Sequence, residues 1–381
     1  MSDDPRIPLF RVTMSDAAPG AAAAVLRSGF IGQGPVVDQF EAALRAALGA
    51  SRDVLTVNSC TSAIDLALHL IGAGRGDSVV STPMTCSATN THLALRGIRI
   101  IWADVDPITG LIDPVDAGCK IDPDTVAIIA VDWAGRLCDY RALKAHGVPV
   151  IQDAAHAWLA ERQGQSVARC GGDYVAWSFQ AIKALTCGDG GALLCPDDET
   201  TERARLLRWY GLDRRSSADF RCAQDIVEAG YKYHMNDISA AIGLANMDVA
   251  RAGVEAARQC AARLSDALAG IRGIVLPPWD PGSSWWLYTL IVEPSLAEGQ
   301  GRENVSSLKG YLAERGIDSS PVHRRNDAHT AFKRATGIYR YGLRGVNAFA
   351  DRELAIPCGW WVDDNAIMRI AQAVREWAES R

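Results

Sequence analysis

Several features that would assign this chain to a common class are missing from its sequence. No block of lysine and arginine stands out and the formal net charge is −6, so we expect no surface for a nucleic-acid polymer. No apolar stretch reaches the length of about 18 residues that a membrane-spanning helix needs. The first ten residues hold Asp3 and Asp4 but no basic segment followed by an apolar run. We therefore expect no secretory signal, no membrane association and a cytoplasmic location.

Sequence signatures of metal and nucleotide sites are also missing. The ten cysteines are scattered without a C-x-x-C pair, which argues against a zinc site and against a disulfide scaffold. We interpret them as buried thiols, except that Cys86 and Cys187 fall beside the candidate site described below. Neither a P-loop nor a G-x-G-x-x-G fingerprint after the first strand is present, so nucleoside-triphosphate and dinucleotide chemistry have little support.

The chain does contain short apolar strands that alternate with helical patterns. Runs typical of buried strands cover residues 54–57, 78–81, 98–102, 126–131 and 148–153. This order predicts an α/β fold with a mostly parallel sheet flanked by helices, in which ligands gather at the carboxyl ends of the strands.

The length of the chain and one long helical pattern predict two domains. A chain of 381 residues is long enough for two, and the pattern of a long helix runs from about residue 238 to 268. We place a large cofactor-binding domain at 1–245 and a smaller C-terminal α/β domain at 246–381. Residues at the N-terminus are expected to pack on the smaller domain.

Lys183 is the first candidate for chemistry. It lies in a glycine-rich link between two strand-like segments, residues 173–179 and 191–195. A lysine held in such a link loses hydration of its charged form, so its pKa falls and its amine becomes a nucleophile. A Schiff base with a carbonyl compound or with pyridoxal phosphate requires such an amine. A solvated surface lysine is the alternative.

The other groups that pyridoxal phosphate needs follow further strands. Thr61 and Ser62 come at a strand-to-helix turn, where free backbone N–H groups bind phosphate, although an ordinary helix N-cap also explains them. Asp153 ends the fifth strand and would keep the pyridine nitrogen protonated. His156 is spaced to donate to the 3′ oxygen of the ring and Ser178 to bind the phosphate. A core histidine and a strand hydroxyl bonded to backbone are the respective alternatives.

Five motifs in the same order resemble the DegT/DnrJ/EryC1/StrS family of sugar aminotransferases. They occupy residues 58–63, 153–157, 178–183, 188–191 and 230–243. The resemblance extends from Ser28-Gly29 to Ile356-Pro357, nearly the whole chain. It implies a type I aminotransferase fold and a homodimer with both active sites at the subunit interface.

The resemblance also implies a role for each of these residues. Pyridoxal 5′-phosphate would be linked to Lys183, with Asp153 at the pyridine nitrogen and His156 near the 3′ oxygen. The phosphate would be held by Thr61, Ser62 and Ser178. Family members usually transfer an amino group from glutamate to a keto sugar attached to a nucleotide, here a 3- or 4-keto-6-deoxyhexose. A ketocyclitol acceptor and a cofactor-binding sensor without turnover are the alternatives.

Two positions differ from the family pattern, and one loop adds two candidate substrate-binding residues. Cys86 stands where many members carry an aromatic residue stacked on the cofactor ring. Lys232 stands where many have an asparagine that reaches the phosphate of the neighbouring subunit, and a lysine still supplies a positive charge there. His323 matches a family position near the sugar, and with Arg324 it would contact the donor carboxylate or the diphosphate. A solvated basic loop explains this pair equally well.

Overall fold

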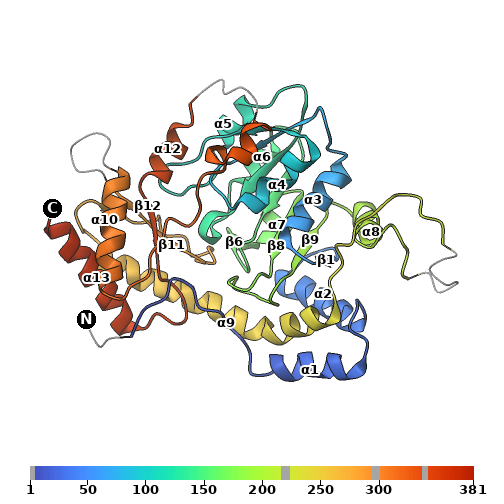
Figure 1. Ribbon diagram of the computed structural model, residues 1–381, viewed down its shortest axis with the longest axis horizontal. Coiled ribbons are helices and arrows are strands. Elements are labelled where there is room, and N and C mark those ends of the chain that lie inside the picture. The colour runs from blue at the N-terminus through green and yellow to red at the C-terminus, as the bar shows by residue number, and fades with distance from the viewer. Residues whose placement is uncertain (1–4, 216–223, 294–300, 337–341) are drawn as a thin grey trace.

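The computed structural model describes residues 5–215, 224–293, 301–336 and 342–381, and a seven-stranded sheet forms its centre (Figure 1). The strand order is β1-β9-β8-β5-β4-β2-β3. The strands are β1 (Val54–Val57), β2 (Ser78–Ser81), β3 (Arg99–Trp102), β4 (Thr125–Val131), β5 (Val150–Asp153), β8 (Tyr174–Ser178) and β9 (Gly191–Leu194). Strands β3, β2, β4, β5 and β8 are parallel, whereas β9 is antiparallel to both β8 and β1. The predicted mostly parallel sheet is therefore confirmed.

Apolar cores lie on both faces of this sheet, because alternate residues of each strand point to opposite faces. In β4, Ile128 and Ala130 belong to one core, and Ala127 and Ile129 belong to the other. The first core is covered by α2 (Pro35–Leu48), α5 (Pro114–Cys119) and α6 (Tyr140–Lys144). The second is covered by α3 (Cys60–Ile71), α4 (Ser87–Arg96) and α8 (Asp198–Leu207). Burial on both faces explains why the strands are almost wholly apolar.

A third core lies under a smaller antiparallel sheet, β10-β11-β12. Its strands are β10 (Ile274–Val275), β11 (Tyr288–Val292) and β12 (Glu353–Ile356), and its main helices are α10 (Gly301–Glu314) and α13 (Asp364–Glu379). Ile7 pairs with Ile317 and is buried in this core. The N-terminal segment thus packs on the core of the smaller sheet.

Helix α9 (Asp237–Leu268) is 32 residues long and connects the two parts of the molecule (Figure 1). Its side chains up to Val254 belong to the core of the large sheet, and from Ala257 they belong to the core of the small one. Helix α1 (Ala18–Ser28) packs along its first half. The boundary at residue 246 stays a prediction, because the helix is continuous through it.

Short elements complete the chain. These are η1 (Trp133–Gly135), β6 (Glu161–Arg162), β7 (Gln165–Ser166), α7 (Val167–Cys170), η3 (Asn326–Ala328), α11 (Thr330–Lys333) and α12 (Arg344–Ala350). No helix among the described residues is long and apolar enough to cross a membrane. The interpretation of the cysteines as buried is wrong for Cys119, which is exposed, and for Cys170, which is half-buried. Cys222 lies outside the described residues.

Candidate active site

Lys183 lies on the link between β8 and β9, and backbone hydrogen bonds hold this link. Because Ser178 is paired with Gly191, the link leaves and re-enters the sheet at one point. The Lys183 N–H donates to the Gln180 carbonyl at 2.9 Å. Burial lowers the pKa of Lys183 from 10.5 to about 8, although the charge of Asp153 acts in the opposite direction. The amine is thus deprotonated in a larger fraction at neutral pH than that of a solvated lysine.

Asp153 ends β5, one strand away from Lys183, and it is only 5% exposed. Its Oδ2 accepts a hydrogen bond from Thr89 Oγ1 at 2.7 Å and its Oδ1 accepts one from the Ala155 N–H at 3.1 Å. Burial is the largest influence and raises the pKa of this carboxyl group, while the hydrogen bond from Thr89 lowers it. A cationic ring nitrogen beside Asp153 would lower the pKa further and favour the carboxylate that we expected.

Two histidines with unpartnered nitrogens lie near this pair. His156 is 6% exposed, and neither its Nδ1 nor His323 Nε2 has a hydrogen-bond partner among the described residues. The two imidazole rings are nearly parallel, with centroids 6.1 Å apart. Burial and the charge of Lys183 lower the pKa of both, that of His323 to about 4. Both rings are therefore neutral at pH 7, and buried unpartnered nitrogens of this kind are positioned for a ligand.

The first turn of α3 is called the cradle here because we expect a phosphate to bind there. It begins earlier than Ala63, where the sequence pattern predicts the start of the helix. The helix starts at Cys60, and Ser59 is its N-cap, since Ser59 Oγ accepts from the Ser62 N–H at 3.0 Å. The hydroxyl of Ser62 donates to Asn58 Oδ1 at 2.6 Å. The Thr61 hydroxyl has no hydrogen-bond partner within the described ranges. Thr61 is thus the freer of the two predicted phosphate ligands, and Ser59 takes the capping role.

Lys232 lies beside this cradle in the same subunit. Its carbonyl accepts a hydrogen bond from Asn58 Nδ2 at 3.1 Å, and its side chain is exposed. Ser178, at the end of β8, is half-buried and accepts a 3.4 Å hydrogen bond from the Gln180 N–H. Both are near the predicted cofactor site, and neither is committed to a strong side-chain interaction of its own.

Two of the predicted site residues are exposed to solvent. Cys86 occupies the N-cap position of α4 and is exposed. Arg324 is also exposed, and its Nη2 donates to the Ala328 carbonyl at 3.1 Å. The sequence also predicts a polar, irregular loop at 214–229 that would shape the substrate pocket, and part of it lies outside the described residues.

Sequence reasoning missed three residues of this site. Thr89 binds Asp153 directly, Trp133 lies edge-on to His156 and His323 at 6.3 and 5.6 Å, and Trp286 stacks on His156 at 3.9 Å. Trp133 comes directly after a predicted strand and Thr89 comes a few residues after another. Their positions in the sequence could therefore have placed both at the edge of the sheet where ligands bind. Trp286 comes from the smaller domain, and only the tertiary fold brings it to Lys183.

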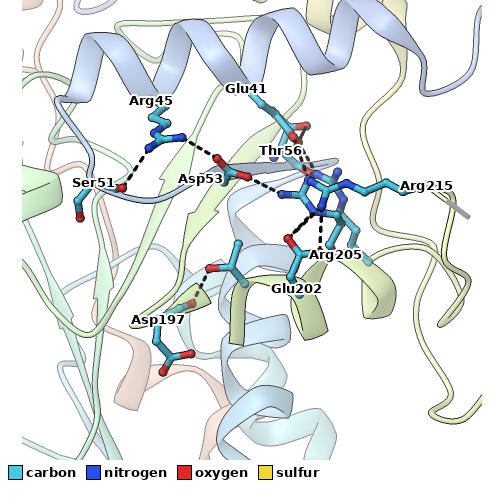
Figure 2. A network of polar contacts seen from close by, with 11 residues as sticks. Glu41, Arg45, Ser51, Asp53, Thr56, Asp197, Glu202, Arg205 and Arg215 are labelled. Carbon is cyan, nitrogen blue, oxygen red and sulfur yellow. Dashed lines mark hydrogen bonds and ion pairs between the residues drawn. The ribbon is translucent and has the colours of Figure 1, made fainter. Parts of the chain in front are cut away.

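A buried ion pair between Glu41 and Arg208 belongs to a network of polar contacts, part of which is shown in Figure 2. Glu41 of α2 accepts from both the N–H and the hydroxyl of Thr56 at 2.8 Å, and it pairs with buried Arg208. The carbonyl of Arg208 in turn accepts from the Tyr233 and His234 N–H groups at 2.9 and 3.0 Å. This network connects α2, β1 and the segment that carries Lys232. Around it Arg205 and Arg45 pair with Asp53.

These residues fit pyridoxal phosphate. A buried lysine amine with a lowered pKa, a buried carboxylate and an open helix N-terminus supply the three contacts that the group requires. The unpartnered nitrogens of His156 and His323 are further donors or acceptors for a polar ligand. Among the described residues no group of three or more His, Cys, Asp or Glu side chains is arranged to hold a metal ion.

Comparisons with known proteins agree with this arrangement. The model of the DegT/DnrJ/EryC1/StrS aminotransferase family matches residues 14–375. The crystal structure of AtS13 from Actinomadura melliaura is 37% identical with a TM-score of 0.89, covering 98% of this chain and 100% of that one. The sugar aminotransferase CalS13 from Micromonospora echinospora is 34% identical with a TM-score of 0.88, covering 97% and 99%. The spore coat polysaccharide biosynthesis protein SpsC of Bacillus subtilis is 32% identical over 362 residues, 92% of each chain.

Proposed function

The chain belongs to the DegT/DnrJ/EryC1/StrS aminotransferase family and is a pyridoxal-phosphate-dependent sugar aminotransferase, and from this premise we propose that glutamate donates its amino group and that a nucleotide-linked keto sugar accepts it. The acceptor is a 3- or 4-keto-6-deoxyhexose. The observation that carries the proposal is the amine of Lys183, with its pKa lowered to about 8, on a firmly held link one strand away from buried Asp153.

We assign the cofactor contacts to residues of this chain as follows. Lys183 forms the covalent link and Asp153 binds the pyridine nitrogen, oriented by its hydrogen bond from Thr89. His156 contacts the 3′ oxygen. The free hydroxyl of Thr61 supports a phosphate at the start of α3, with Ser62 and Ser178 nearby. Lys232 supplies a positive charge to the phosphate of the neighbouring subunit.

Lys183 Nζ is also the group that moves the proton. Pyridoxal phosphate, when bound, supplies an electron sink for the charge that remains when a proton leaves the α-carbon of the amino donor. Lys183 Nζ would accept that proton and deliver it to the cofactor carbon that is bonded to the same nitrogen. A general base is most effective when its pKa lies near the working pH, and burial moves the pKa of Lys183 in that direction.

His323 and Arg324 are assigned to the substrate. The assignment of His323 is supported by its neutral imidazole, whose Nε2 has no partner among the described residues and whose ring lies parallel to that of His156. The exposed guanidinium of Arg324 is suited to a carboxylate or a diphosphate, both of which accept paired hydrogen bonds from arginine. Cys86 leaves the cofactor ring with less contact than an aromatic residue gives.

An absorption experiment on the purified protein tests the proposal. After loading with pyridoxal phosphate, we expect the visible band of the lysine-bound cofactor, which falls when glutamate is added while the band of the amino form rises. Lys183→Ala removes both changes. A visible band that no amino donor affects would contradict the catalytic assignment and favour the sensor. Nucleotide-linked 3- and 4-keto sugars and a ketocyclitol are then compared as acceptors, with the aminated product detected by mass spectrometry.

We further propose a cytoplasmic homodimer with shared active sites. The exposed side chain of Lys232 supports the dimer, since it lies on the segment next to the cradle and is accessible to a second subunit. Sedimentation analysis of the full chain measures the oligomeric state directly.

A further inference from the structure

Trp286 contacts two residues of the proposed site although it belongs to the smaller domain. Its Nε1–H donates to the carbonyl oxygen of Ile182 at 3.0 Å, directly before Lys183. The Nζ atom of Lys183 lies 3.8 Å from the centroid of the indole ring. The same ring stacks on His156, with centroids 3.9 Å apart and planes at 22°. One side chain therefore contacts the backbone next to the lysine, its amine and the imidazole.

The backbone before Trp286 is held in an unusual conformation. Trp285 has a φ of +49°, in the left-handed region that residues other than glycine seldom adopt. Its buried ring stacks between Trp279 and Tyr288, at 5.5 and 5.7 Å, and its Nε1 donates to the Asp280 carbonyl at 3.0 Å. Surrounding structure of this kind is needed to maintain strain, and such strain clusters at functional sites. The packing thus determines where Trp286 points.

The indole of Trp286 also has an apolar neighbour and borders a cavity. Phe10 of the N-terminal segment stacks on it at 5.0 Å. Lys183 and Trp286 together line a small cavity of about 50 Å³, with Trp360 and Arg11 also in its wall. Removal of the indole would enlarge this cavity at Lys183.

Building on the proposed function, we propose that Trp286 is a positioning residue of the transamination site. Its N–H anchors the link at Ile182, its ring covers the amine of Lys183, and its stacking holds the plane of His156. The smaller domain thereby contributes directly to the orientation of the nucleophile.

The ring acts on the protonation of Lys183 in two opposite ways. An aromatic face attracts the ammonium form, but covering the amine removes water and favours the neutral form. Burial is the largest cause of the lowered pKa of Lys183, and the charge of Asp153 opposes it. Removal of the ring should therefore raise this pKa.

The test measures the reactivity of Lys183 in the full-length chain after removal of the cofactor. Trinitrobenzenesulfonate reacts only with the neutral amine, and mass spectrometry of the peptide that contains Lys183 gives the rate at each pH. For Trp286→Ala we expect a higher midpoint and about fivefold slower modification near pH 8, which corresponds to a rise of the midpoint by about one pH unit. Trp286→Phe keeps a smaller ring, so we expect a smaller change in the same direction.

The matched control is Trp360→Phe, which alters an indole of the same cavity that is 41% exposed. This variant should keep the wild-type dependence of the Lys183 modification rate on pH. If both Trp286 variants showed the wild-type pH dependence of Lys183 modification, the proposal would be overturned. If the alanine variant does not fold, Trp286→Phe alone decides. A shifted midpoint in a protein whose wild type fails to transaminate would refute the proposed function and leave the role of Trp286 intact.

Discussion

At the scale of single residues, burial acts on Lys183 and Asp153 in the same sense, since it favours the neutral form of each. The pKa of the amine is lowered and that of the carboxyl group is raised, and the charge of each partner opposes the effect on the other. Such neighbours titrate as a pair. A bound group that carries its own positive charge next to Asp153 therefore changes the protonation of both residues.

Lys183→Met should stabilise the protein when the cofactor is removed. The native state holds the lysine with a pKa of about 8 and the unfolded chain with 10.5, a difference worth about 3 kcal/mol. The charged lysine therefore destabilises the native state fully below pH 8, and this penalty disappears as the pH rises toward 10.5. We expect a gain of about 1–3 kcal/mol at pH 7, because Asp153 also loses a cationic neighbour, and a smaller gain at pH 10. Urea unfolding at both pH values measures it, and a gain that grows with pH would contradict the assignment.

The buried carboxyl group of Glu353 should make the stability of the protein depend on pH in the opposite direction. It is 1% exposed in β12, and its Oε2 has no hydrogen-bond partner in the described part of the chain. Burial raises its pKa from 4.5 to about 8. Because the unfolded chain releases this proton first, stability falls as the pH rises from about 4.5 to 8. Glu353→Gln should match the wild type at pH 4.5 and exceed it by a few kcal/mol at pH 8.5. Equal denaturant midpoints at pH 8.5 would refute this.

At the scale of elements, the close approach of β9 to the start of α3 shapes the phosphate cradle. A Cβ atom on Gly191 would lie 2.5 Å from the Cys60 nitrogen and 2.8 Å from the Ser59 oxygen. Both are backbone atoms of the first helical turn, so they cannot rotate away. The glycine is thus required by the contact between a strand and a helix.

Gly191→Ala should separate β9 from α3 and weaken cofactor binding. We expect a loss of stability of about 1–3 kcal/mol, as for other overpacked interiors, and a clear fall in affinity for pyridoxal phosphate measured by fluorescence titration. The control is Gly74→Ala, where no atom lies within 4 Å of the added Cβ. If Gly191→Ala bound the cofactor as tightly as the control, the cradle would lie elsewhere.

Elements were predicted from sequence more reliably than the contacts between them. Strands β1 and β2 have the predicted bounds, and α9 differs by one residue at its start, because apolar runs and helix caps are local signals. The start of α3 was misplaced by three residues, since Ser59 and Ser62 both suit a cap. The antiparallel insertion of β9 and the arrival of Trp286 at Lys183 depend on packing between distant segments, which no local pattern encodes.

At the scale of the whole molecule, two sheets with separate cores meet around Lys183. The large sheet supplies Asp153 and the cradle, and the segment before β11 of the small sheet supplies Trp286. The N-terminal segment joins them from a third direction through Phe10 and Ile7. The site therefore depends on the relative placement of all three parts.

A mixture of inactive subunits tests the shared site in the proposed dimer. Lys183→Ala and Lys232→Ala subunits are each expected to be inactive or strongly impaired. If Lys232 serves the site of the other subunit, a mixed dimer contains one intact site and one doubly altered site. Random exchange of equal amounts should then restore about a quarter of wild-type activity. Activity that stays at the average of the two variants would place Lys232 in its own subunit's site or outside both.

The continuity of α9 also limits how the chain can be divided. A cut between the two halves of the sequence at residue 246 falls inside a single helix of 32 residues, roughly 48 Å long. The C-terminal fragment would keep residues 247–254 of this helix without the large-sheet core that covers them, and the N-terminal fragment would expose the part of that core on which they pack. We therefore expect that the two parts of the molecule joined by α9 do not fold when they are expressed separately, and that an exchange of one part with a relative must include the whole helix.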